Sequence, residues 1–179
     1  MDFSSFESEL TASLLRFVTG KGFLDGTMLS SVTGDFAEKW EELAPAYVAD
    51  AVKEFNQYPE FSLACALYAG MAIAVLWDAD WEKYKTVEYS KLQGERGFDN
   101  MDDHIAAVFL GMGVGEGPAQ KLSELASGCA STAMSAMRHA PVERQTSDAF
   151  YLMVSAAKCL YMTGASIQLH AMGYSMAKM

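Results

Sequence analysis

The sequence predicts an all-α protein, a single domain of about six helices packed as a bundle. Two observations carry this prediction. Residues 61–77 contain no charged side chain, and a helix that is apolar on every side must be covered on every side. Most other segments place apolar residues three and four positions apart, which is the period of an amphipathic helix. A chain of 179 residues can bury a core as one domain, so we assign residues 1–179 to a single domain.

The central helix of this bundle is predicted over about residues 59–85. Its uncharged stretch is 17 residues long, close to the lower limit of a membrane span. Ser62, Tyr68 and several alanines also make this stretch only weakly hydrophobic. We therefore expect a buried core helix and no contact with a membrane.

The first helix is expected to begin at a capping box. Ser4 and Glu7 have the required spacing, in which the hydroxyl and the carboxylate satisfy amide donors at a helix start. Gly20 supplies the conformational freedom that ends this helix. The connector over residues 22–34 shows little pattern and is expected to hold one turn around residues 28–32.

The second long helix is expected to start at Asp35 and to reach about residue 57. Pro45 interrupts its apolar stripe. Because proline lacks the amide donor and clashes with the preceding turn, this helix should either kink or split into two shorter helices.

The segment after the central helix is expected to be less regular. Residues 86–98 are charged and contain glycine, which is typical of a surface loop. Asp99 can then cap a short helix, and Pro118 suits the first turn of the next one.

The last and longest helix is predicted over about residues 146–177. At ~1.5 Å per residue it would be ~45 Å long, enough for its end to project from a compact bundle. One row of small side chains would permit close approach of another helix; it includes Cys159, Thr163, Ser166, His170 and Gly173. The expected exposed edge of this helix consists of Val154, Tyr161, Gln168 and Ser175.

Composition restricts the partners and the compartment. The net charge of −10 disfavours binding to nucleic acid or to anionic membranes. The first residues lack the basic region of a secretory signal, so we expect a cytoplasmic protein. Cys65, Cys129 and Cys159 are widely spaced among apolar residues, so we expect buried thiols and neither disulfides nor a CxxC metal site.

Two kinds of site are candidates. A small molecule would need a polar anchor in an apolar pocket, and Lys158 or Asp78 could supply it, although a lysine on an apolar helix more often reaches water or a structural ion pair. The candidate ligand-binding residues are Lys158, Asp78, Trp77, Trp81 and Tyr151. A divalent metal would need converging carboxylates; the candidate ligands are Asp78, Glu82, Asp102 and His104. The sequence assigns no catalytic residue and no cofactor.

The apolar faces of the last helix are broader than one bundle is expected to bury. This breadth favours an interaction or structural protein that forms a homodimer through its C-terminal helix. The candidate interface residues are Ile167, His170, Ala171 and Tyr174. The alternatives are a small-molecule-binding module with an aromatic and Met-lined pocket and, third, a metal-dependent enzyme that uses the carboxylate cluster.

Overall fold

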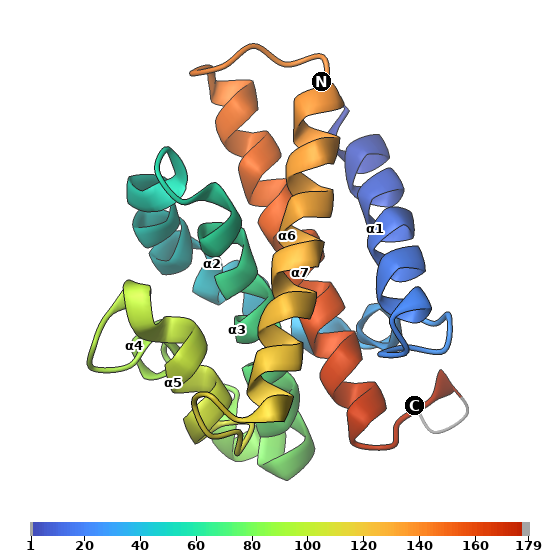
Figure 1. The fold of residues 1–179 in the computed structure, drawn as a ribbon, viewed down its shortest axis with the longest axis vertical. Helices are drawn as coiled ribbons and strands as arrows, with labels where there is room; N and C mark the ends of the chain where they lie inside the picture. Colours follow the sequence, from blue (N-terminus) through green and yellow to red (C-terminus); the bar gives the residue numbers. More distant parts are fainter. Residues whose placement is uncertain (1, 177–179) are drawn as a thin grey trace.

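The computed structural model describes residues 2–176 and confirms the all-α fold (Figure 1). Within these residues it contains seven α-helices, two short 3₁₀ helices and no strand. The elements are α1 (Phe3–Gly20), η1 (Leu29–Val32), α2 (Gly34–Phe55), α3 (Pro59–Tyr84), α4 (Tyr89–Gln93), η2 (Phe98–Asn100), α5 (Met101–Val108), α6 (Gly117–His139) and α7 (Ser147–Ala171).

Two helices, rather than one, form the centre of the bundle. The predicted central helix α3 packs most extensively against α7. At their crossing, a side-chain carbon added to Gly70 would collide with the carbonyl oxygen of Tyr161, and one added to Gly164 would collide with that of Leu67. The two backbones are therefore in direct contact. This contact uses Gly164, which lies outside the row of small residues that was expected to permit close approach.

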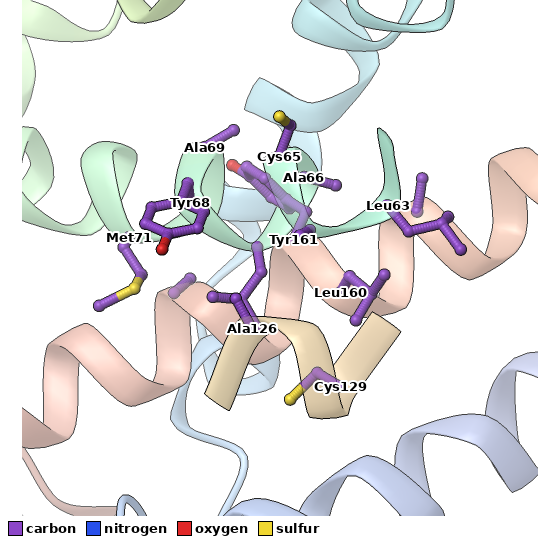
Figure 2. Packing of buried hydrophobic residues seen from close by; sticks show 14 of the residues in the cluster. Leu63, Cys65, Ala66, Tyr68, Ala69, Met71, Ala126, Cys129, Leu160 and Tyr161 are labelled. Atoms are coloured by element: carbon purple, nitrogen blue, oxygen red, sulfur yellow. The ribbon is translucent and has the colours of Figure 1, made fainter. Parts of the chain in front are cut away.

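Large side chains surround this crossing. The exposed edge expected for α7 is wrong at Tyr161, which is buried and donates a hydrogen bond to the carbonyl oxygen of Phe36 over 3.0 Å. Figure 2 shows the Tyr161 ring against the part of α3 that carries the small residues Cys65 and Ala66. Small residues on α3 therefore leave room for an aromatic side chain from α7.

Both α3 and α7 are long and apolar enough to cross a membrane by length and composition alone. In this structure, however, 78% of the most apolar window of α3 and 67% of that of α7 are buried inside the protein. Core helices of bundles have this property, so the structure accounts for their apolar character through packing within the chain.

The beginnings of α1 and α2 differ from the predicted ones. Asp2 caps α1, where its carboxylate accepts a hydrogen bond from the Ser4 amide over 3.0 Å. Thr33 caps α2 in the same way, because its hydroxyl oxygen accepts a hydrogen bond from the Asp35 amide over 3.3 Å. Helix α2 then runs without division through Pro45, which is exposed. The expected turn in the connector is confirmed as η1.

Helix α3 is interrupted near its end. Asp80 has an extended backbone, with φ −171° and ψ 90°. Its carboxylate accepts a hydrogen bond from the Lys83 amide over 3.3 Å and so caps the final turn. The predicted continuous helix to about residue 85 is wrong at this point, because Asp78 and Glu82 lie on opposite sides of the interruption.

Three expectations for the later segments also need correction. The segment at residues 86–98 contains helix α4, whose Tyr89 and Leu92 are buried. Helix α5 begins after Asn100, and no side chain, including that of Asp99, caps it. Helix α7 ends at Ala171, earlier than predicted. The part of that prediction at residue 177 lies outside the described residues.

Candidate functional site

The structure brings together Trp77, Asp78 and Tyr174, which the sequence assigned to different candidate sites. The Tyr174 hydroxyl donates to Asp78 Oδ1 over 2.7 Å, and the ring centres of Trp77 and Tyr174 are 5.6 Å apart. Trp77 Nε1 also donates to Asp35 Oδ2 over 3.0 Å. These contacts attach the segment after α7 to the first turn of α2 and to the C-terminal part of α3. Their role is structural. The hydrogen bond to Asp78 raises the pKa of Tyr174.

The four candidate interface residues do not form one exposed face. Ile167 is only 2% exposed and belongs to the core of the same chain. His170 is half-buried, whereas Ala171 is exposed. Tyr174 contacts Asp78, as described above. The apolar breadth of α7 that suggested an interface at these residues is therefore explained by burial within the bundle.

The candidate metal ligands lie in separate surroundings. Glu82 pairs with Lys85 at 3.0 Å, and His104 Nε2 lies 3.0 Å from the carbonyl oxygen of Lys91. Asp102 accepts a hydrogen bond from the Asp103 amide over 2.8 Å, and burial raises its pKa. Across residues 2–176, no group of three or more His, Cys, Asp or Glu side chains is arranged to hold a metal ion. The geometry does not support the proposed carboxylate site.

Lys158 lies on the seam between α1 and α7, where Lys158 Nζ is 3.9 Å from Glu7 Oε1. This is the structural ion pair that the sequence favoured for this lysine. The pair borders a shallow pocket of about 270 Å³, which is smaller than typical ligand pockets of roughly 300–1,000 Å³. The pocket lining consists of Glu7, Ser8, Thr11, Lys158, Cys159 and Met162. It contains none of the aromatic residues that were expected to hold a ligand.

The cysteines are buried and unpaired, as predicted. Cys159 is close to the pocket, but burial raises the pKa of its thiol to about 11. Its sulfur accepts a hydrogen bond from Thr11 Oγ1 over 3.6 Å and donates one to the Glu7 carbonyl oxygen over 3.7 Å. A thiol with this pKa stays protonated at neutral pH, so Cys159 is poorly suited to act as a nucleophile.

Three aromatic side chains meet at the start of α1 and α7. The Phe3 and Tyr151 rings are 6.3 Å apart, and the Phe150 and Tyr151 rings are 5.3 Å apart. Phe150 is 40% exposed and Tyr151 is 54% exposed. We call Phe3, Phe150 and Tyr151 the aromatic patch. Trp81, the remaining candidate for ligand binding, is half-buried at the distant end of α3 and does not belong to it.

A larger groove lies at the same end of the bundle and is lined by residues of α1, of the end of α6 and of the start of α7. Figure 1 shows that these three helix ends lie together. The volume of the groove is about 650 Å³. We call it the α1/α6 groove. Its lining consists of Asp2, Ser5, Phe6, Glu9, Leu10, Ser13, Ala136, His139, Ala140, Pro141 and Asp148.

Sequence reasoning missed a buried lysine in α2. Lys39 is 2% exposed, and its ammonium group donates to Glu42 at 3.0 Å and to the carbonyl oxygens of Lys85 and Val87, each at 2.7 Å. All three donors are thus satisfied, so Lys39 joins α2 to the end of α3 as a structural clamp. Its position was a usable signal, because Lys39 follows Phe36 at helical spacing on the buried face.

Comparison with protein-family models, with curated proteins and with solved structures finds no match. The fold is that of an all-α bundle, a class that hosts unrelated functions.

Proposed function

We propose that this chain is an interaction protein that associates with a second copy of itself through the exposed N-terminal part of α7 and the adjoining side of α1. The observation that carries this proposal is the aromatic patch. Aromatic side chains are enriched at the centres of protein interfaces, where they supply large contact areas. The proposed contact stays on the C-terminal helix but lies away from Ile167, which the core already buries.

The charges beside the patch support pairing with a second copy. An isologous dimer places the same surface on both subunits, so that surface must complement itself. Glu7 and Lys158 provide one charge of each sign, and at 3.9 Å their contact within the chain is long. In a two-fold arrangement, Lys158 of one copy faces Glu7 of the other. Because these two charges cancel, two copies of the seam do not repel each other. The chain as a whole has a net charge of −10, so most other surfaces of two copies would repel.

Native mass spectrometry over a dilution series tests this proposal. We expect a dimer for the unaltered protein and a monomer for Tyr151→Glu, because a carboxylate would have to be buried at the centre of the contact. Val114→Glu is the matched control, since Val114 is 66% exposed and lies in the loop between α5 and α6. A monomer at every concentration of the unaltered protein would refute self-association.

A charge-exchange experiment separates contact between copies from the pair within one chain. Glu7→Lys gives every copy two positive charges at the seam, and Lys158→Glu gives every copy two negative charges. Each variant alone should therefore form a weaker dimer. When the two variants are mixed, opposite charges face each other only across the interface. Recovery of a mixed dimer would support the proposed arrangement, whereas failure of the mixture to recover would contradict it.

The alternative of a small-molecule-binding module rests on Lys158 and its shallow pocket of about 270 Å³. The geometry favours it less than self-association, because the aromatic candidates for that pocket lie elsewhere.

A further inference from the structure

The α1/α6 groove combines an apolar floor with an acidic rim. Phe6 and Leu10 of α1 are buried beneath it and are 7% and 1% exposed. Ala136 and Ala140 extend this floor on the side of α6. Because Leu10 is almost completely covered, the apolar surface that an occupant can reach belongs mainly to Phe6, Ala136 and Ala140.

The rim carries Asp2, Glu9 and Asp148, and no lysine or arginine within residues 2–176 belongs to the lining. Arg16, which is outside the lining, donates a hydrogen bond to Ser13 of the lining over 3.1 Å. Neither Glu9 nor Asp148 forms an ion pair with any residue in the described part of the chain. Asp2 and Asp148 also stand at helix starts, where the helix dipole favours a carboxylate. Glu9 has no such role, because it lies in the interior of α1.

This arrangement matches the chemistry of lysine and arginine side chains. Each has an apolar stem that can cover a hydrophobic surface and a charged head that can reach beyond it. The histidine at the rim, His139, is held through its Nδ1, which lies 2.7 Å from the carbonyl oxygen of Ser135. The three carboxylates at the rim outnumber this one histidine.

We propose that the α1/α6 groove binds an amphipathic basic segment of a partner protein. The lysine or arginine stems of that segment lie over Phe6, Ala136 and Ala140, and their charged heads reach Glu9 and Asp148. Charge complementarity selects this occupant over an acidic or a neutral segment. This inference does not depend on self-association, because the groove and the aromatic patch use different residues.

The test uses the full chain and a fluorescent synthetic helix built from Leu and Lys, with a counterpart in which Glu replaces every Lys. Anisotropy at physiological salt measures binding, and amide chemical shifts locate it. We expect the Lys peptide to bind with shifts centred on Ser5, Glu9 and Ala136, and the Glu peptide not to bind. Shifts spread evenly over the acidic surface would overturn the proposal.

Matched variants separate the groove from the general acidity of the protein. Glu9→Gln combined with Asp148→Asn should weaken binding about tenfold, because the peptide loses two exposed ion pairs. Glu41→Gln combined with Glu124→Gln removes two exposed negative charges elsewhere and should leave the affinity unchanged. Equal losses in both double variants would overturn the assignment to the groove.

A titration with spermidine, a free aliphatic polyamine, distinguishes a partner segment from a small cation. We expect spermidine to bind much more weakly than the peptide, because it lacks the apolar face that covers the floor. Equally tight binding that also depends on Glu9 would show that the groove takes a free cation, and it would overturn the proposed partner segment.

Discussion

The ammonium group of Lys39 lies 2.7 Å from the carbonyl oxygen of Lys85, so a charged side chain of α2 caps the end of α3 from inside the protein. The carbonyl oxygen of Val87 and the carboxylate of Glu42 complete its contacts. A buried charge is tolerated when hydrogen-bond partners surround it in this way.

Replacing Lys39 by methionine should destabilise the protein. The change leaves the carbonyl oxygens of Lys85 and Val87 without their donor, at a cost of about 1–3 kcal/mol in the free energy of unfolding. Urea denaturation followed by circular dichroism measures this cost. Lys53→Met, at an exposed position of the same helix, should leave the urea midpoint nearly unchanged. Equal midpoints for both variants would show that Lys39 is not a structural clamp.

Replacing Gly164 by alanine should also destabilise the fold, although alanine favours helices. The added methyl group collides with the Leu67 carbonyl oxygen and must push α3 and α7 apart. Overpacking of this kind costs about 1–3 kcal/mol. Thermal unfolding of Gly164→Ala and Gly20→Ala provides the comparison, because Gly20 has open space at its side-chain position. A Gly164→Ala protein as stable as the Gly20→Ala control would contradict the close crossing.

The buried thiols predict a loss of stability at alkaline pH. Burial raises the pKa of Cys129 to about 12 and that of Cys159 to about 11, from an ordinary value of 9.0. The thiols of the unfolded chain therefore ionise first. Their contribution to stability is complete below pH 9.0 and is lost as the pH rises, toward about 11 for Cys159 and toward about 12 for Cys129. Urea midpoints across this range should fall, and they should fall less steeply for Cys129→Ala.

A thiol-specific reagent gives an independent check of the same thiols. The native protein should react very slowly at neutral pH, and all three cysteines should react once the protein is unfolded. Rapid reaction of the native protein would show that at least one thiol is accessible.

The fold class and the position of α3 could be predicted from the sequence, because an uncharged stretch of this length over residues 61–77 needs apolar surroundings on every side. The interruption at Asp80 could not be predicted, since aspartate occurs both inside helices and at their caps. Helix α4 was missed because five residues are too few to show a helical period.

The sequence was least informative about which apolar surfaces stay exposed. The pattern of α7 shows that its faces are apolar but does not show what covers them. Burial of Ile167 and Tyr161 against other helices of the same chain explains most of this apolar surface. Of the candidate residues, Tyr151 lies on an exposed aromatic surface, and its proximity to Phe3 depends on a contact between distant parts of the chain.

The crossing of Gly70 and Gly164 has a consequence for synthesis of the protein. Gly164 follows Gly70 by 94 positions. Because the ribosome adds roughly 5–20 residues per second, the crossing position of α7 is synthesised about 5–20 s after that of α3. During this time the most apolar segment of the nascent chain lacks its principal neighbour. We therefore expect α3 to be the segment that chaperones bind while the ribosome completes α7.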